Sequence, residues 1–182
     1  MVGNSRSIVA ARPAPHPDLA RCVRRHCTTV YRRPLAAHTE DAFAALVERL
    51  DPALPVVLDA GCGTGESSAR LAALHPGAQI VGVDKSAHRL GRTPLEAAPR
   101  VLLLRADLQD FWRLACAARW RPLAHYLLYP NPWPKAVHLK RRWHAHPVFP
   151  TLLELGGRLE LRTNWAAYAR EFAEALGLCG ID

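Results

Sequence analysis

Three glycines directly after an apolar run indicate a loop that could hold a ligand. The run VVLDA at residues 56–60 leads into GCGTG, so that Gly61, Gly63 and Gly65 follow the carboxylate of Asp59. Glycine adopts tight backbone conformations and lets a ligand lie against bare backbone. Such a loop favours a nucleoside ligand, although the same glycines would also serve a plain turn.

Two more acids fall where a nucleoside would need them. Asp84 ends the run QIVGVD, 19 residues after Gly65, and Asp107 ends a third apolar run. A carboxylate at Asp84 could accept hydrogen bonds from both hydroxyls of a ribose, and one at Asp107 could meet an adenine amino group. In the dinucleotide fingerprint GxGxxG the third glycine would fall at Glu66, whose charge would repel a pyrophosphate. The pattern therefore disfavours a nicotinamide cofactor.

The segments that must position these residues alternate between strand and helix patterns. Helical stretches, including one that Thr39 could cap and one at 66–74, separate most of the apolar runs. This alternation predicts right-handed crossovers and a mostly parallel α/β sheet with helices on both faces. In such a sheet a ligand lies at the carboxyl ends of the strands, where the glycines and acids fall. The predicted strands are residues 56–60, 79–84, 100–108, 124–130 and 158–164.

Composition limits the class of protein. A chain of 182 residues with 49% hydrophobic residues fits one globular domain. No apolar run approaches the ~20 residues of a membrane helix and no signal-peptide core stands at the N-terminus, so we expect a cytoplasmic protein without a membrane partner. The five cysteines lack paired spacing, which argues for free thiols and against a metal site.

Basic residues concentrate in two segments. Residues 1–38 hold seven arginines against Asp18 alone, a charge of +6, and residues 111–153 hold seven Lys and Arg and no acid, a charge of +7. Concentrated basicity indicates a polyanion such as RNA, against the alternative of a generally basic solvated surface. The Pro- and Arg-rich residues 1–38 lack clean periodicity, which predicts a segment, mobile or strapped over a site, ahead of a domain at residues 39–182.

Three motifs in the second half of the chain are distinctive together. They are YPNPWPK (Tyr129–Lys135), HLKRRW (His138–Trp143) and GGRLELRTNWAAYA (Gly156–Ala169). With LDAGCGTG before them, they resemble the bacterial tRNA (guanine-N7-)-methyltransferase family, whose patterns are close to FPDPWPK, a basic HxKRR run and TDWxxYA. The resemblance runs from about Leu58 to Tyr168. It implies a Rossmann-like class I methyltransferase sheet and S-adenosyl-L-methionine as cofactor.

The same resemblance implies a role for each matching position, with tRNA as the partner. Asp59 and the three glycines would line the methionine end of the cofactor, Asp84 its ribose and Asp107 its adenine. Asn131 would occupy the catalytic and cofactor-side position, and Lys135 would contact the substrate nucleoside. Contacts to RNA and to the guanine would fall to His138, Lys140, Arg141, Arg142, Thr163 and Asn164.

Physical chemistry supports an RNA role for the basic run independently of the resemblance. Lysine and arginine side chains that neutralise phosphates release counterions, which makes binding steeply dependent on salt. Trp133 and Trp143 could stack on exposed bases, or they could pack against the edge of the sheet.

Asparagine replaces the family's aspartate at two positions, Asn131 and Asn164. The guanine pocket implied by the resemblance therefore lacks two negative charges. N7 of guanine carries no proton, so methyl transfer mostly needs alignment, whereas recognition of guanine N–H groups would weaken. Two alternatives stay open: methylation of an exocyclic amine, since Asn131-Pro132 is similar to the start of [DN]PP[YF], and a catalytically silent RNA-binding relative.

The sequence stops soon after the helix that follows the fifth predicted strand. Class I methyltransferases usually continue with an antiparallel pair of strands, so we expect the sheet to lack that pair. The strand at 158–164 would then expose an edge that a second copy could cover, which predicts a homodimer as one possibility. A truncated copy and a fragment are the others.

Overall fold

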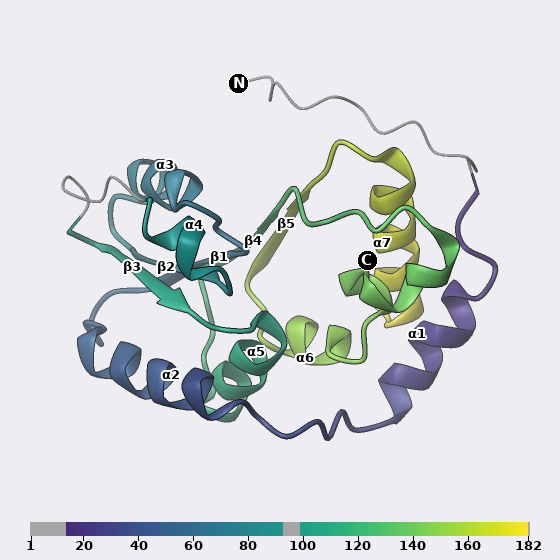
Figure 1. The fold of residues 1–182 in the computed structure, drawn as a ribbon, viewed down its shortest axis with the longest axis horizontal. Helices are drawn as coiled ribbons and strands as arrows, with labels where there is room; N and C mark the ends of the chain where they lie inside the picture. The colour runs from purple at the N-terminus through teal and green to yellow at the C-terminus, as the bar shows by residue number, and fades with distance from the viewer. Residues whose placement is uncertain (1–13, 93–98, 182) are drawn as a thin grey trace. The chain divides into compact units, whose positions relative to one another are not determined.

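A five-stranded sheet dominates the computed structural model, which describes residues 14–92 and 99–181. The strand order is β3-β2-β1-β4-β5, and every pair with a defined register is parallel (Figure 1). The mostly parallel α/β sheet predicted from the sequence is therefore confirmed. The strands are β1 (Val56–Ala60), β2 (Gln79–Asp84), β3 (Val101–Arg105), β4 (Ala124–Leu128) and β5 (Arg158–Arg162).

Helices connect and flank these strands. Two of the helical segments, η1 and η2, are 3-10 helices, and both follow β4 in the sequence. No helix within the described ranges is long and apolar enough to cross a membrane. The helical segments are α1 (Leu19–Thr28), α2 (Ala37–Arg49), α3 (Glu66–Leu74), α4 (Ala87–Leu90), α5 (Leu108–Ala117), η1 (Ala136–Arg141), η2 (Trp143–Ala145), α6 (Phe149–Glu154) and α7 (Ala166–Leu178).

The chain divides into two compact units. We call the first the sheet unit, which comprises the described part of 33–128 together with 151–160. The second, the helical unit, comprises the described residues up to Arg32 together with 129–150 and 161–181.

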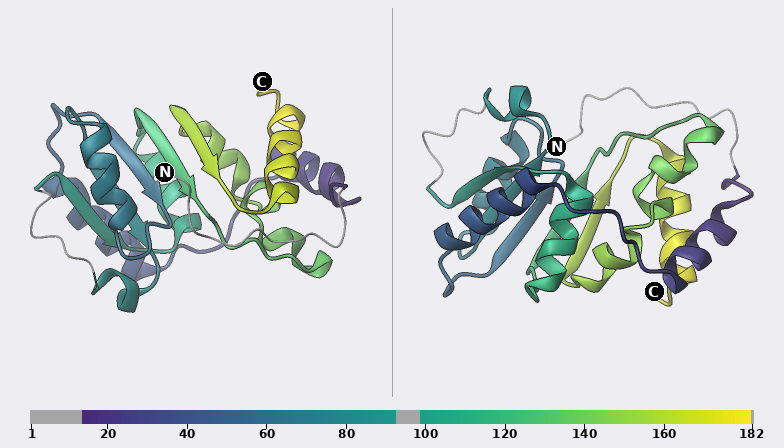
Figure 2. Two further views of the ribbon diagram at one scale, coloured as in Figure 1. Left: turned by 90° about the horizontal axis from the view of Figure 1, so that it is seen from above. Right: turned by 60° about the horizontal axis from the view of Figure 1, so that its bottom comes forward.

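Crossover handedness explains how the helices of the sheet unit are distributed. The path β1 to β2 to β3 moves in one direction across the sheet and the return to β4 moves in the other, so right-handed connections place α3 and α5 on opposite faces. Helix α2 packs on α5, where the rings of Phe43 and Phe111 lie 5.6 Å apart. Both helices lie in front of the strands in the right-hand view of Figure 2. The core between the layers includes fully buried Val57 and Ile80.

In the helical unit, α1 lies beside α7. The Sγ atoms of Cys27 and Cys179 are 3.0 Å apart at one end of this pair, and both cysteines are free thiols. Aromatic rings fill the interior, with Tyr168 fully buried and Phe149 set edge-on against Phe172.

The limits of β1, β2 and α3 match the predicted segments, whereas the other three strands end earlier than expected. The prediction that Thr39 caps a helix is wrong. Helix α2 begins at Ala37, and the buried Thr39 hydroxyl instead accepts a hydrogen bond from the backbone N–H of Asp107 at 3.4 Å. Over the described residues the sheet has no antiparallel pair, and β5 forms one edge. A homodimer through that edge stays a prediction.

Candidate active site

The glycine loop after β1 has a backbone that only glycine adopts without strain. Gly61, Gly63 and Gly65 have φ values of +85°, +61° and +77°, all in the left-handed region. The N–H groups of Gly61 and Cys62 both donate to the carbonyl of Val83, at 2.8 and 3.1 Å. The loop is thereby fixed against the end of β2, with bare backbone at the carboxyl edge of the sheet.

Asp59 lies two positions before Gly61 in this loop, and only one of its two carboxylate oxygens has hydrogen-bond partners among the described residues. Its Oδ2 accepts hydrogen bonds from the hydroxyls of Ser67 and Ser68, at 2.6 and 2.7 Å. Its Oδ1 is buried and has no hydrogen-bond partner among the residues that the structure describes. Burial raises the pKa of Asp59, and the two serine hydrogen bonds act against that rise. A buried acceptor without a partner suits a ligand that brings a donor, such as an ammonium group.

Gly82 supports Asp59 from the neighbouring strand, a role that the sequence reasoning missed. The two residues are register partners in β1 and β2. A Cβ atom on Gly82 would lie 2.5 Å from Ser68 Oγ and 2.6 Å from Leu103 Cδ2. Glycine therefore allows α3 to approach closely enough for Ser68 to reach Asp59. The available signal was a glycine inside an otherwise apolar strand, which often marks a close approach.

Asp84 joins the end of β2 to the glycine loop. It is 3% exposed, and its Oδ2 accepts a hydrogen bond from the N–H of Gly63 at 3.1 Å. Its Oδ1 accepts from the N–H of Ser86 at 2.8 Å and pairs with the guanidinium of Arg89 at 2.9 Å. A carboxylate has about four acceptor sites, so contacts to a ribose stay compatible with these bonds. The ribose role of Asp84 stays a prediction.

Asp107 lies two residues beyond β3 as the N-cap of α5, which corrects the prediction that it ends the strand. Its Oδ1 accepts from the N–H of Gln109 at 3.3 Å and its Oδ2 from Nε2 of the same residue at 3.0 Å. The guanidinium of Arg33 lies 3.9 Å from Oδ2. The carboxylate is thus held by the first turn of α5, and its predicted adenine contact would compete with Gln109.

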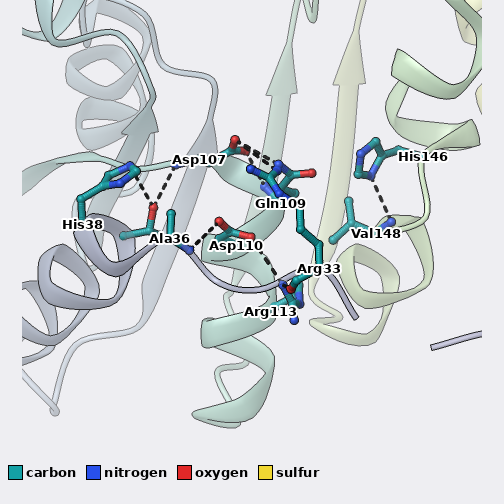
Figure 3. A network of polar contacts seen from close by, with 10 residues as sticks. Arg33, Ala36, His38, Asp107, Gln109, Asp110, Arg113, His146 and Val148 are labelled. Atoms are coloured by element: carbon teal, nitrogen blue, oxygen red, sulfur yellow. Dashed lines mark hydrogen bonds and ion pairs between the residues drawn. The ribbon is translucent and has the colours of Figure 1, made fainter. Parts of the chain in front are cut away.

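Asp110, which the sequence reasoning did not select, anchors the chain ahead of α2 (Figure 3). Its side chain is fully buried, and Oδ2 accepts from the N–H of Ala36 at 3.2 Å. Arg113 lies 3.5 Å from Oδ1 and donates to the carbonyl of Arg33 at 2.6 Å. These contacts hold residues 33–36 against α5, next to Asp107.

In the helical unit, the loop after β4 presents Asn131 to solvent in a constrained turn. Asn131 is exposed, and its Oδ1 accepts from the N–H of Trp133 at 3.3 Å. Tyr129 and Trp133 have φ values of +52° and +47°, which are uncommon for bulky residues. The N–H of Tyr129 donates to the carbonyl of Arg162 at 2.7 Å, which sets the start of the loop beside the end of β5.

Arg142 is buried beneath this loop, which corrects its predicted place among the solvent-facing RNA contacts. Its side chain is 3% exposed, and Nη1 donates to Oε2 of Glu171 at 2.5 Å. Nε and Nη2 both donate to the carbonyl of Trp133, at 3.3 and 3.2 Å. The guanidinium also lies over the ring of Trp165, 4.8 Å from its centroid. One cation therefore connects the Asn131 loop to the residue after Asn164.

Glu171 gathers the buried polar groups of the helical unit. Besides Arg142, its carboxylate contacts Nε2 of His144 at 2.9 Å and the N–H of His16 at 3.0 Å. Burial raises the pKa of Glu171, but the hydrogen bonds from His144 and Arg142 outweigh burial and bring it to about 2. The carboxylate is therefore ionised at neutral pH. Nothing in the local sequence distinguishes Glu171 from Glu174, the other acid on α7.

The other predicted RNA contacts lie on or beside η1. Lys135, Lys140 and Arg141 are exposed, and His138 is half-buried. The Arg141 guanidinium lies over the ring of Trp133, 4.7 Å from its centroid, and covers one face of this half-buried indole. In the loop before α7, the hydroxyl of Thr163 accepts from the N–H of Trp165 at 3.2 Å, and Asn164 between them is half-buried.

The described residues hold no group of three His, Cys, Asp or Glu side chains placed to bind a metal ion.

Comparison with known proteins gives one family match: the model described as "Putative methyltransferase" matches residues 53–179, from ahead of β1 to the end of α7. The chain belongs to this methyltransferase family. The resemblance inferred from the three motifs is confirmed at that level.

Relatives of this methyltransferase carry a more specific name. The tRNA (guanine-N(7)-)-methyltransferase of Treponema pallidum (strain Nichols) is 31% identical over 129 residues, which cover 67% of this chain and 51% of the relative. The protein of the same name from Streptomyces coelicolor is 34% identical over 140 residues, covering 72% and 51%. The chain thus spans about half the length of these curated relatives.

Among solved structures, the aminoglycoside resistance methyltransferase NpmB1 has a similar fold. The TM-score is 0.52 at 20% sequence identity, and the match covers 85% of this chain and 74% of that one. At this identity the likeness shows the fold alone.

Proposed function

We propose that this chain transfers a methyl group from S-adenosyl-L-methionine to N7 of a guanine in tRNA. The observation that carries the proposal is the loop of three left-handed glycines over Asp59, whose buried Oδ1 has no partner among the described residues. The name shared by the relatives from T. pallidum and S. coelicolor supplies the substrate class. A tRNA substrate is consistent with the expected cytoplasmic location.

The residues around the glycine loop fit the cofactor by their chemistry. Asp59 Oδ1 would accept a hydrogen bond from the ammonium group of the methionine moiety, and the glycine backbone would lie against that moiety. Asp84 has about one acceptor site left for a ribose hydroxyl, and the Asp107 side chain is 31% exposed and accessible to an adenine amino group. When bound, the cofactor supplies a methyl group on a positively charged sulfur.

Alignment is the main task left to the protein, because N7 of guanine is a nucleophile without a proton to remove. The Asn131 amide is exposed in a turn that its own Oδ1 closes, and it would contact the guanine edge as donor and acceptor. Asn164 would contribute a second amide. Arg142 would act as a positioning residue, since it holds both the Trp133 carbonyl and the Trp165 ring.

Exposed cations would hold the RNA around this base. Lys135, Lys140 and Arg141 lie on one short stretch that includes η1 and carries no acid. Contacts from such side chains to phosphates bring affinity and a steep dependence on salt. Of these three cations, Lys135 is the nearest in sequence to Asn131, four positions away, and we expect it to contact the methylated nucleoside.

The test is methyl transfer from radiolabelled S-adenosyl-L-methionine to unmodified tRNA, followed by digestion of the RNA and identification of the labelled nucleoside. Label on 7-methylguanosine supports the proposal. Label on an exocyclic amine would favour the chemistry that Asn131-Pro132 also allows. No label, with cofactor binding still seen by calorimetry, would contradict the proposal and leave a cofactor-binding RNA module or a truncated enzyme. Asp59→Asn serves as the control that should lose cofactor binding and label together.

A further inference from the structure

A cavity of about 600 Å³ opens in the helical unit between α1 and η1. We call it the α1 groove. Arg21, Arg25 and Lys140 line it together with Asp18, and Val137 and Leu139 supply apolar surface. The volume is in the range of pockets that hold small ligands, roughly 300 to 1,000 Å³. The α1 residues belong to the basic segment 1–38, whose charge indicates a polyanion without showing which arginines would bind it.

The charge of the groove favours an anion. Three cations face one carboxylate, and that carboxylate, Asp18, already pairs with Arg21 at 2.7 Å. Within residues 14–92 and 99–181 no acidic side chain forms an ion pair with Arg25 or Lys140. Burial lowers the pKa of His26 in the groove wall, and the charges of Arg25 and Lys140 lower it further. His26 is therefore neutral at pH 7. The positive charge of the groove comes from Arg25 and Lys140, which have no acidic partner among the described residues.

The apolar part of the groove favours a ligand with a flat or ribose-like face. Val137 is 87% exposed although it lies among basic residues, whereas Leu139 beside it is buried. An exposed apolar side chain next to cations fits a nucleotide, because the phosphate would meet the cations and the base or ribose would cover the apolar surface. An acidic peptide would satisfy the cations but would give Val137 no ring to contact.

A hydrogen bond joins α1 to η2, the helical segment that follows η1. The thiol of Cys22 on α1 donates to the carbonyl of Ala145 in η2 at 3.4 Å, and both residues are buried. Because η2 follows η1 in the sequence after a single residue, this bond ties α1 to the stretch that carries Lys140. Because the groove is already formed in the free protein, binding a ligand there would cost little conformational entropy.

We propose that the α1 groove binds a nucleotide of the RNA substrate, with a phosphate between Arg25 and Lys140 and the base or ribose against Val137. The proposal rests on the proposed function and extends it, because it makes α1 part of the RNA-binding surface. It also assigns Lys140 to a defined pocket rather than to a diffuse basic patch.

The experiment measures binding of a fluorescently labelled tRNA transcript at a series of KCl concentrations. Arg25→Ala should reduce the slope of log affinity against log salt by roughly 0.7 to 0.9, and weaken binding at low salt about threefold or more. Arg24→Ala is the matched control, since Arg24 is exposed on the same helix and does not line the groove. The control should stay within about twofold of wild type. Val137→Asp should weaken binding, whereas Val137→Leu should preserve it.

Several outcomes would contradict the proposal that the α1 groove binds a nucleotide. They are an unchanged slope in Arg25→Ala, an equal loss in the Arg24→Ala control, and poly-L-glutamate competing as well as unlabelled tRNA. Circular dichroism of each variant shows whether a loss reflects unfolding, and Arg25→Lys should then restore binding where Arg25→Ala lost it. The methyl-transfer assay on the same preparations separates the two proposals. If the wild-type chain binds tRNA through Arg25 but transfers no methyl group, the groove proposal would stand and the proposed function would be rejected.

Discussion

At the scale of single residues, neighbours in the basic run do different work. Arg141 and Arg142 are adjacent and chemically identical, yet one lies over Trp133 at the surface and the other is buried against Glu171. The sequence predicted the run as a unit because a stretch of bases gives no sign of which side chain turns inward. The turn follows from η1, which ends at Arg141, so that Arg142 leaves the helix in an extended conformation.

Arg142→Met should destabilise the protein by about 3 to 5 kcal/mol, because it leaves the Glu171 carboxylate buried without its cation. Arg141→Met should change the free energy of unfolding by no more than about 1 kcal/mol, since its ring contact is exposed. Urea denaturation followed by fluorescence measures both. Adding Glu171→Gln to Arg142→Met should recover part of the loss. Equal effects of the two single variants would contradict the assignment.

At the scale of elements, apolar runs bounded by glycine or proline were predicted well and α1 was not. The strands β1 and β2 and the helix α3 could be placed because the strands are short, mostly aliphatic runs and the glycine loop separates β1 from α3. Helix α1 buries Leu19, Cys22, Val23 and His26, which is regular helical spacing. The pattern was missed because two of the four buried residues are a cysteine and a histidine, and the surrounding sequence is rich in arginine and proline. Gly82 and Asp110 were missed because their roles depend on side chains from other elements.

Gly82→Ala should destabilise the sheet unit by about 1 to 3 kcal/mol, because the new methyl group would overlap Ser68 and Leu103. Moving Ser68 would also disturb its hydrogen bond to Asp59, so binding of S-adenosyl-L-methionine should weaken as well. Calorimetry of cofactor binding and thermal unfolding measure the two effects. Gly77→Ala is the control, since a Cβ atom there meets no atom within 4 Å. If Gly82→Ala binds the cofactor as tightly as the wild type, Gly82 does not support the cofactor site.

At the scale of the whole molecule, each unit buries a histidine. His125 in the sheet unit accepts a hydrogen bond from Nε1 of Trp112 at 3.2 Å, and burial lowers its pKa to about 3. Burial lowers the pKa of His144 in the helical unit too, with Glu171 acting in the opposite direction. Neither feature could be predicted from the sequence, where nine histidines look alike.

The protein should lose stability in mild acid. Because the pKa of His125 is lower in the folded state than the ordinary 6.5, the unfolded chain binds more protons between these values and stability falls as the pH falls. From about pH 7.5 to about pH 5, His125 alone should remove about 2 kcal/mol from the free energy of unfolding. Urea denaturation at both pH values measures the change. His125→Gln keeps an acceptor for Trp112 and should reduce the pH dependence; an unchanged dependence would exclude His125 as its source.

The paired thiols of Cys27 and Cys179 make the apparent stability of this protein depend on the redox state of its buffer. The two sulfurs lie 3.0 Å apart but are separated by 152 positions in the sequence. Exchange with oxidised glutathione would join them and release two molecules of the reduced tripeptide, closing most of the chain into a covalent ring. Such a ring would restrict the unfolded chain and stabilise the fold by about 5 kcal/mol. Melting curves recorded with and without reductant should therefore differ, and Cys179→Ser should remove the difference.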